Sequence, residues 1–196
     1  KAYRAQVLGR LAANRGTTHV SIIDAQGNAA SLSLTNGEGS AYIVPGTGIM
    51  LNNMLGEEDL NPQGFDQWPG DQRLCSMLTP TLIARADGRL AVMGSGGSNR
   101  IRTAILQTLV NTLDFAMTLE DSVSRPRIHF EGGLLSIEPG FDNSSTEALE
   151  ADFPNMQHWQ ERNMFFGGVH AVEFDPSRNR FSGVGDPRRG GVVVGA

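Results

Sequence analysis

Alternating hydrophobic and polar positions near the start of the chain predict a β-hairpin. The segment HVSIID at residues 19–24 is rich in β-branched residues, and AASLSLT at 29–35 alternates with a period of two. The tetrapeptide AQGN at 25–28 lies between them and predicts the turn. Antiparallel pairing around such a turn joins positions whose numbers add up to about 52. The pattern therefore places Thr35 opposite Thr17 at the open end of the hairpin.

Further along, the hydrophobic pattern alternates between strand and helix periods. A second hairpin is expected at 81–95, with Asp87-Gly88 at its turn, and a third at 170–184. A helix is predicted over 99–117, where one apolar stripe contains Ile101, Ala104, Ile105, Leu109, Leu113 and Ala116. A short helix is also expected at 2–13, ended by Asn14-Arg15-Gly16.

Helix-capping residues locate two more helices and a strand between them. Thr118 and Asp121 form a capping box for a helix that Pro126 ends. A strand is expected at 134–138, and Ser144 with Glu147 is expected to begin a helix that ends before Pro154. Residues 56–73 are polar and are interpreted as a loop over a site or an interface. Hairpins interleaved with helices predict an α/β (α+β) fold, an antiparallel sheet covered by helices.

Composition narrows the classes of function only slightly. The 196 residues fit one domain, and the net charge of −5 argues against nucleic acid as a partner. Cys75 is the single cysteine, so no internal disulfide forms, and a small buried residue is its default interpretation. The four histidines have no metal-ligand spacing and are interpreted as structural or surface residues, so no metal is expected. No run in the sequence is long enough for a membrane span.

The junction RGTTHVSIID carries the main candidate chemistry. A threonine hydroxyl is a poor nucleophile unless a base lies beside it, and a threonine at a new chain terminus can use its own α-amino group. Thr17 follows Gly16 at the start of a predicted strand. This arrangement suits self-cleavage of the Gly16–Thr17 bond, because glycine presents no side chain to the attacking hydroxyl and tolerates a strained backbone. The sequence Gly-Thr-Thr at residues 16–18 is also common where a turn leads into a strand.

Seven segments in order show a family resemblance: TTHVSIIDAQGNA, PGTGIMLNN, MLTPTLI, GSGGSNRI, ILQTLVN, RPRIHFE and GVGDPR. From Thr17 onward the chain resembles the small subunit of γ-glutamyltransferases. The resemblance implies a four-layer αββα sandwich of the N-terminal-nucleophile hydrolases, of which this chain supplies part. It also implies that residues 1–16 are the end of the large-subunit region and that 17–196 are the small-subunit catalytic domain.

The resemblance also implies roles for individual residues. Thr17 matches the nucleophile, and Thr35 matches the threonine whose hydroxyl supports it. The glycine pair of GSGGSNRI matches the loop that supplies backbone amides to the oxyanion hole. Ungapped alignment from Arg100 gives Gly97 and Ser98, whereas alignment on the glycines gives Gly96 and Gly97, so all three remain candidates. A phosphate loop is the alternative interpretation, but the segment lacks the Lys-Ser/Thr ending of that motif.

The candidate substrate-binding residues depart from the family pattern. The family has Ser-Ser where this chain has Cys75-Ser76, and an asparagine where it has Gly37, flanked by Asn36 and Glu38. The acidic residue that the family places after its Asn-Asn pair falls on Glu57, which is followed by Glu58 and Asp59. These acidic residues are ordinarily an exposed loop. The family's carboxylate-binding arginine belongs to the large subunit.

One further motif has two interpretations. The segment Asp186-Pro187-Arg188-Arg189 reads most simply as a turn with a solvated charge pair, while the resemblance suggests that it braces the sheet near the site.

The predicted function is γ-glutamyl transfer or hydrolysis through a γ-glutamyl ester of Thr17, with water or an amino acid as acceptor and without metal or cofactor. The partners are a small γ-glutamyl substrate, such as glutathione, and the large-subunit region of the same precursor. Two alternatives remain: a related amidase acting on a β-lactam side chain or a polyglutamate, and a non-catalytic relative that never matures. The uncut chain is expected to be inactive. The resemblance implies a periplasmic or secreted protein and leaves a cytoplasmic one open.

Overall fold

The computed structural model describes residues 16–195, so the helix expected at 2–13 lies outside the described residues. The described chain forms two compact units. The larger one contains residues 18–34 and 76–195, and the smaller one contains residues 16–17 and 35–75. This division follows packing, and it differs from the boundary between residues 16 and 17 that the resemblance implies.

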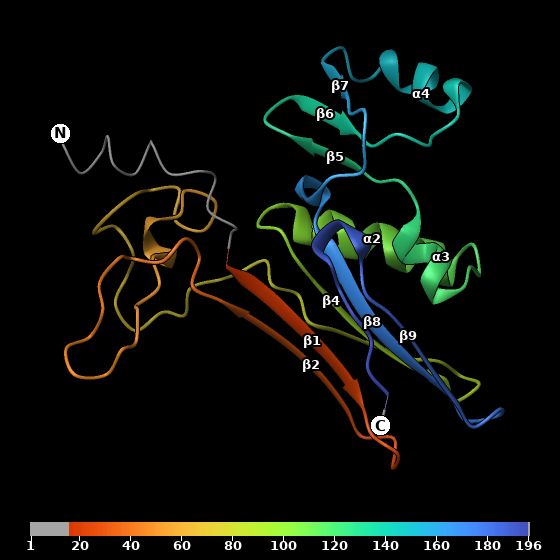
Figure 1. Cartoon of the computed structure of the whole chain (residues 1–196). Helices are drawn as coiled ribbons and strands as arrows, with labels where there is room; N and C mark the ends of the chain where they lie inside the picture. Colours follow the sequence, from red (N-terminus) through yellow and green to blue (C-terminus); the bar gives the residue numbers. More distant parts are fainter. Residues whose placement is uncertain (1–15, 196) are drawn as a thin grey trace. The chain divides into compact units, whose positions relative to one another are not determined.

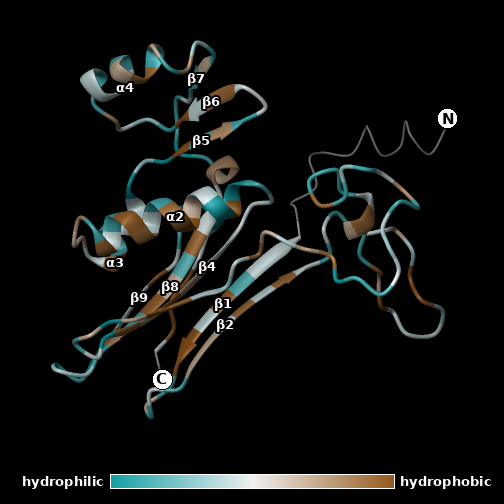
Figure 2. Ribbon diagram, turned by 180° about the vertical axis from the view of Figure 1, so that it is seen from behind, coloured by the Kyte–Doolittle hydropathy of each residue, from teal (hydrophilic) through white to brown (hydrophobic). Residues whose placement is uncertain are grey.

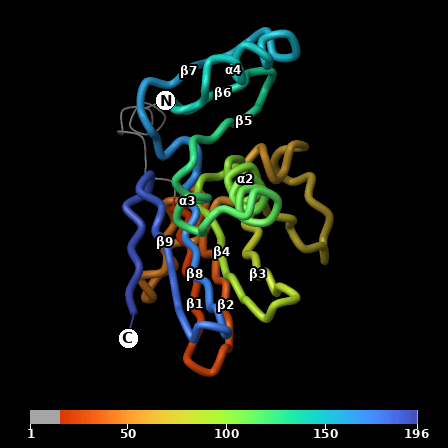
Figure 3. The backbone as a smooth tube through the Cα atoms, turned by 90° about the vertical axis from the view of Figure 1, so that its right-hand side faces the viewer, coloured from red at the N-terminus to blue at the C-terminus, as the bar shows by residue number. Residues whose placement is uncertain are grey.

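A four-stranded antiparallel sheet is the centre of the larger unit. Its order is β3-β4-β8-β9, and Figures 1 and 3 show β4, β8 and β9 side by side. Both hairpins expected here are confirmed, and β4 and β8 are additionally paired with each other over their length. The strands are β3 (Thr81–Ala84), β4 (Leu90–Gly96), β8 (Gly168–Asp175) and β9 (Arg180–Val184).

The first predicted hairpin is also confirmed, as β1 (Thr17–Ile23) and β2 (Ala29–Thr35), and it lies on one face of this sheet. Its turn closes where Asp24 N–H donates to the carbonyl of Asn28 over 3.0 Å. Hydroxyl groups join the two layers: Ser21 donates to the carbonyl of His170 and Ser31 to that of Met93. The hairpin's inward positions are polar, whereas Val20, Ile22, Leu32 and Leu34 are exposed on its outer face.

Two helices cover the opposite face of the four-stranded sheet, α2 (Arg100–Leu113) and α3 (Leu119–Ser124). Hydrophobic residues from both helices and from β4, β8 and β9 form the buried core, and Figure 2 shows the hydrophobic and hydrophilic positions interleaved along α2. The Thr118 cap is confirmed, because its Oγ1 accepts the Asp121 N–H. The core residues are Met93, Ile101, Ala104, Ile105, Leu119, Val123, Val169, Ala171 and Val184.

Helix α2 ends four residues before the predicted Met117. Leu113 is 46% exposed, and Ala116 lies beyond the helix with a φ of 50°, so neither belongs to the buried stripe. The chain turns here because the N–H groups of Phe115 and Met117 bond back to the carbonyls of Val110 and Asn111. A left-handed residue cannot continue an α-helix, which ends the periodic pattern.

A third sheet of short strands was only partly foreseen. Strand β6 (Leu134–Ile137) was predicted, but its antiparallel neighbour β5 (Ile128–Glu131) and its parallel neighbour β7 (Met156–His158) were not. Helix α4 (Asn143–Glu150) follows β6 and ends before Pro154 as expected. Its N-cap is Asp142, which accepts the Ser145 N–H, so the predicted cap at Ser144 was wrong by two residues.

The smaller unit is built from turns and short bridges. Its only regular segment among residues 35–75 is the 3-10 helix η1 (Met54–Gly56), which confirms the loop interpretation of 56–73. Asn61 holds this loop together, since its buried side-chain amide donates to the carbonyls of Leu55 and Gly64. Two further 3-10 turns lie in the larger unit, η2 (Met164–Phe166) and η3 (Pro187–Arg189).

In the larger unit, the β1–β2 hairpin, the four-stranded sheet and the pair α2 and α3 form three successive layers, and the sheet β5-β6-β7 and α4 are additional to them. The antiparallel sheet covered by helices is confirmed. Within residues 16–195, none of the helices has the length and hydrophobicity that crossing a bilayer requires.

Candidate active site

The two threonines singled out by the hairpin register are hydrogen-bonded to each other. The Thr17 hydroxyl donates to Oγ1 of Thr35 over 3.0 Å, across 18 residues of sequence. Oγ1 of Thr35 also accepts the N–H of Gly37 over 2.9 Å. Both threonines are half-buried. The Thr35 hydroxyl is thus held by the backbone that follows it, and it in turn orients the hydroxyl of Thr17.

The residue before Thr17 is anchored to the same segment. The Gly16 N–H donates to the carbonyl of Gly37 over 3.3 Å. Among the described residues, a Cβ at Gly16 would meet only the carbonyl oxygen of Gly37, at the ordinary contact distance of 3.5 Å, so their packing does not require glycine here.

Gly37 lies beside a carboxylate and an amide that belong to the smaller unit. A Cβ at Gly37 would lie 2.0 Å from Oε1 of Glu57 and 2.3 Å from Oδ1 of Asn53. Oδ1 of Asn53 accepts the N–H groups of Glu38 and Gly39, at 2.7 and 3.1 Å. Gly37 also has a φ of 61°, so this position favours glycine for two independent reasons. Asn53 was noted in the sequence only as part of the Asn-Asn landmark, and its bonds to the turn identify it as a supporting residue.

The other candidate substrate-binding residues are less closely gathered. Asn36 and Glu38 are exposed, and they flank Gly37 in the turn after β2. Cys75 is exposed, so its default interpretation as a buried residue was wrong. The reason is that residues 71–76 form neither helix nor strand. Ser76, also exposed, begins the second stretch of the larger unit, whereas Cys75 ends the smaller one.

The candidate oxyanion loop follows β4 directly. Gly96 is the last residue of the strand and pairs with Gly168, whereas Gly97 has a φ of 141° and Ser98 a φ of 54°. Two successive positive φ angles turn the chain sharply, and the carbonyls of Gly97 and Ser98 accept the N–H groups of Arg100 and Ile101. Side chains hold the start of α2 beyond the loop, because Glu131 pairs with Arg100 at 3.4 Å and accepts a hydrogen bond from Asn99. Glu131 has no sequence signal of its own.

The family model described as gamma-glutamyltranspeptidase matches residues 1–196. The chain belongs to the gamma-glutamyltranspeptidase family. This finding confirms the resemblance seen in the seven sequence segments.

The relatives of this chain have names that describe different activities. The chain is 36% identical over 165 residues to the acylase ACY 1 proenzyme of Pseudomonas sp. strain V22, covering 82% of this chain. It is 28% identical over 182 residues to the glutathione hydrolase proenzyme of Bacillus subtilis strain 168, covering 91% of this chain. It spans only 28% and 30% of these two relatives' lengths.

A solved structure confirms the fold class. The transpeptidase enzyme CapD of Bacillus anthracis is similar with a TM-score of 0.73 and 28% identity, over 91% of this chain and 99% of that one. The chain thus has the mixed α/β fold of the N-terminal-nucleophile hydrolases.

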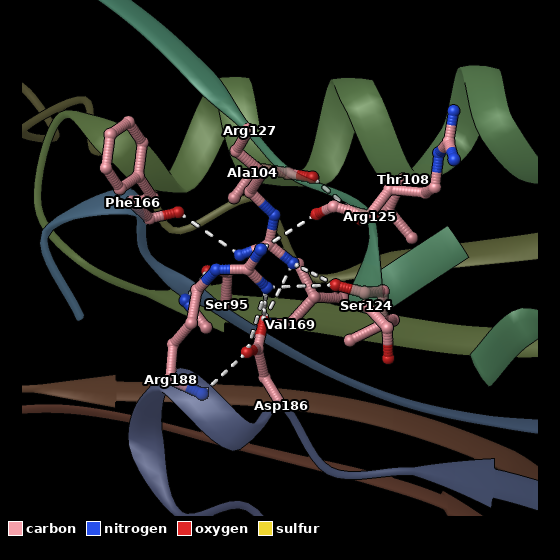
Figure 4. A network of polar contacts seen from close by, with 12 residues as sticks. Ser95, Ala104, Thr108, Ser124, Arg125, Arg127, Phe166, Val169, Asp186 and Arg188 are labelled. Carbon is pink, nitrogen blue, oxygen red and sulfur yellow. Dashed lines mark hydrogen bonds and ion pairs between the residues drawn. The ribbon is translucent and has the colours of Figure 1, made fainter. Parts of the chain in front are cut away.

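The segment 186–189 is not a solvated turn. Asp186 is fully buried, and its carboxylate pairs with Arg127 at 2.7 Å and with Arg188 at 3.2 Å (Figure 4). Arg188 also pairs with buried Glu138 at 2.6 Å. The solvated interpretation was wrong because both partners, Arg127 and Glu138, come from the segments flanking β5 and β6, far away in sequence.

Of the four histidines, His19 and His129 are buried and His158 is exposed, and His19 lies two residues after the nucleophile candidate Thr17. His19 is buried between hairpin and sheet, and its two ring nitrogens contact the hydroxyls of Ser33 and Ser21, both at 2.8 Å. Burial, and secondarily the charge of His170, lowers the pKa of His19 to about 4. The imidazole is therefore neutral at pH 7. Within residues 16–195, no three His, Cys, Asp or Glu side chains are placed to bind a metal ion together.

Proposed function

We propose that this chain is the small-subunit catalytic region of a γ-glutamyl acyl transferase or hydrolase whose nucleophile is Thr17. The observation that carries the proposal is the 3.0 Å hydrogen bond between the hydroxyls of Thr17 and Thr35, at the residue that directly follows Gly16. A threonine hydroxyl so oriented, at a position where cleavage gives it a free α-amine, has both requirements of a terminal nucleophile. Family membership supports the same assignment.

Maturation comes first in the proposed reaction. Oγ1 of Thr17 attacks the carbonyl carbon of Gly16, and the Gly16–Thr17 C–N bond breaks as a C–O ester bond forms, with the hydroxyl proton transferred to the departing nitrogen of Thr17. Water then hydrolyses this ester, leaving a carboxylate on Gly16 and a free amine and hydroxyl on Thr17. The hydrogen bond from Gly16 N–H to Gly37 supports this step, because it holds the residue before the scissile bond in place.

Turnover repeats the same chemistry on the substrate. The amine of Thr17 accepts the hydroxyl proton as Oγ1 attacks the γ-carbonyl, and the proton is passed to the departing amine. Backbone amides of the 96–98 loop would stabilise the oxyanion. The turn at Gly97 and Ser98 supports these two residues over Gly96, which is paired within the sheet. The γ-glutamyl ester is then released to water or to an amino acid, and no metal or cofactor is required.

Substrate recognition is proposed to involve Asn36, Glu38, Glu57, Cys75 and Ser76. Glu57 has the strongest support, because its carboxylate lies beside Gly37, two residues after Thr35. A carboxylate there suits the α-ammonium group of a γ-glutamyl substrate. The large-subunit region of the same precursor is the proposed partner, and it would supply the carboxylate-binding arginine and the remaining layer of an αββα sandwich. The hydrophobic side chains exposed on the outer face of the β1–β2 hairpin support the proposal that a further layer packs against this face.

A second candidate is an amidase for another acyl group. Its support is the 36% identity over 165 residues to an acylase proenzyme, which equals the 36% identity over 129 residues to a glutathione hydrolase proenzyme of Pseudomonas aeruginosa. The departures at Gly37, Glu57 and Cys75 concern the residues that would recognise the substrate. A non-maturing, non-catalytic relative is the third possibility from the sequence.

Two substrates that differ by one group distinguish these functions. The matured full-length precursor is assayed with γ-glutamyl-p-nitroanilide and with glutaryl-p-nitroanilide, which lacks only the α-amino group. We expect kcat/KM to be at least about tenfold higher for the γ-glutamyl compound. Only this compound has the α-ammonium group that would pair with the Glu57 carboxylate, and losing such a polar contact lowers kcat/KM by at least this factor. The opposite preference would favour the acylase, and a full-length precursor that neither matures nor turns over either compound would favour the non-catalytic relative.

A further inference from the structure

Four charged side chains form a buried network in the larger unit, and Figure 4 shows three of them, Arg127, Asp186 and Arg188. Arg127 and Arg188 supply two guanidinium groups, and Glu138 and Asp186 supply two carboxylates, so the charges balance. The side chains of all four are at most 2% exposed. Arg188 bonds both oxygens of Glu138, at 2.7 and 2.6 Å, and Arg127 bonds Asp186 at 2.7 Å.

This network holds the segment 163–169 at three points. Arg127 Nη1 donates to the carbonyl of Phe166 over 3.2 Å, and Asp186 Oδ2 accepts the N–H of Val169 over 2.9 Å. Oε1 of Glu138 accepts the N–H of Asn163 over 3.2 Å. The same carboxylate and guanidinium groups that pair with each other therefore also fix the backbone of this segment.

The segment held in this way is the immediate neighbour of the loop. Gly168 pairs with Gly96, and Oγ of Ser95 links them, because it accepts the Gly168 N–H and donates to the Gly96 carbonyl, both over 3.1 Å. A Cβ at Gly97 would lie 2.8 Å from Cα of Gly167. The two backbones are thus in direct contact, and a displacement of 166–169 is transmitted to Gly96 and Gly97.

Stability alone is a weak reason for such a network. Removing four charges from water is costly, and replacing buried ion pairs by apolar residues of similar volume is often neutral or stabilising. What apolar residues cannot supply is a set of directed hydrogen bonds to the Phe166 carbonyl and the Val169 N–H. The network is therefore better suited to fixing a position than to adding stability.

We propose that the network Arg127–Asp186–Arg188–Glu138 positions the backbone amides of the 96–98 loop for turnover, with Arg127 and Asp186 as positioning residues. The inference rests on the proposed function, which assigns oxyanion stabilisation to this loop. Amides that miss the oxyanion by a fraction of an ångström lose transition-state stabilisation while substrate binding is preserved. The effect should accordingly appear in kcat and not in KM.

Two variants of the full-length precursor test the proposal. Asp186→Asn keeps an oxygen for the Val169 N–H but removes the charge that pairs with both arginines. The double variant Arg127→Met with Asp186→Asn restores the charge balance, since Glu138 and Arg188 still neutralise each other, and it removes the bond to Phe166. Rates of γ-glutamyl-p-nitroanilide hydrolysis are divided by the amount of chain that begins at Thr17, measured by intact mass.

We expect kcat to fall roughly ten- to a hundredfold in both variants, with KM changed less than about threefold. Hydrogen exchange of peptides spanning 94–99 should be faster than in the wild type, in the precursor as well as in the mature protein. Ile105→Val, a methyl deletion in the hydrophobic core whose side chain forms none of the network's hydrogen bonds, is the control and should keep the wild-type kcat and exchange.

Two results would overturn the inference while leaving the proposed function intact. One is a double variant with wild-type kcat per mature chain, and the other is unchanged exchange of 94–99 in either variant. A wild-type mature protein without turnover of the γ-glutamyl substrate would instead overturn the proposed function, and the inference with it. Because exchange is also measured in the precursor, a variant that does not mature still gives a decisive result.

Discussion

Oγ1 of Thr17 lies 3.0 Å from Oγ1 of Thr35, at the open end of a hairpin whose turn is closed by Asp24 and Asn28. The register that produces this contact follows from the turn position, because each pair across the hairpin has the same sum of residue numbers. His19 and Ser33 obey the same rule and are also in contact, at 2.8 Å. The hairpin register therefore brings the two threonines, which are 18 residues apart in sequence, opposite each other and within hydrogen-bonding distance.

Removal of the Thr35 hydroxyl should misplace the nucleophile without deleting it. We expect Thr35→Ala to slow both maturation and turnover by roughly ten- to a thousandfold, the range for losing one positioned catalytic group. The free energy of unfolding should fall by only about 1 kcal/mol, although Gly37 N–H also loses an acceptor. Thr35→Ser keeps the oxygen and is the matched control. Wild-type rates in Thr35→Ala would show that this hydroxyl has no supporting role.

Gly97 should tolerate no side chain, for reasons of both space and conformation. Its φ of 141° is unfavourable for any other residue, and a Cβ would lie 2.8 Å from Cα of Gly167. We expect Gly97→Ala to lower the free energy of unfolding by about 2 kcal/mol or more, measured by chemical denaturation. Gly132→Ala is the control, because Gly132 also has a positive φ, 57°, but faces open space. Equal losses in the two variants would show that the contact with Gly167 is unimportant.

His19 should make stability depend on pH in the mildly acidic range. Burial lowers the pKa of His19 from 6.5 to about 4, so the unfolded chain binds the proton more readily than the folded protein. The free energy of unfolding is therefore highest above about pH 6.5. It decreases as the pH falls toward 4, by at most about 3 kcal/mol.

Chemical denaturation of His19→Gln and wild type at several pH values between 7 and 4.5 tests this expectation. The variant should show a shallower decline, but still some decline, because burial also lowers the pKa of His170 and of His129. The same change at exposed His158 is the control. A decline as steep in His19→Gln as in wild type would contradict the assignment.

The chain with residues 1–16 still attached should have no γ-glutamyl transfer activity. The nitrogen of Thr17 is then part of a peptide bond and cannot accept a proton, and the proposed large-subunit arginine is missing. The check is p-nitroaniline release from γ-glutamyl-p-nitroanilide by the uncut chain, with the matured full-length protein as the positive control. Clear release by the uncut chain would mean that the base is another group.

Local patterns predicted those parts of the fold that depend on neighbours in sequence. The three hairpins and the Thr118 cap follow from turn residues, β-branched runs and a capping box. The end of α2 was missed because the apolar period continues past Leu113, while the left-handed Ala116 breaks the helix. Strands β5 and β7 were missed because they are short and no turn residues of a hairpin mark them, whereas the equally short β3 was marked by the Asp87-Gly88 turn.

In the candidate site, too, local sequence patterns predict some contacts, whereas others depend on residues far apart in sequence. Thr17 and Thr35 could be paired from the hairpin register alone. The burial of Asp186 could not be predicted, because its charge is neutralised by Arg127, which is 59 residues away. The contacts of Gly37 with Glu57 and Asn53 likewise depend on how a loop of the smaller unit folds back, and no periodic pattern encodes that path.

The most direct test of the central claim is the intact mass and N-terminal sequence of the full-length precursor after incubation. The account predicts a new chain that begins at Thr17 and a partner chain that ends at Gly16. It also predicts that Thr17→Ala stays uncut, whereas Thr17→Ser, which keeps a hydroxyl, retains some cleavage. A product that begins at any other residue, or cleavage that persists in Thr17→Ala, would contradict the assignment of Thr17 as the nucleophile.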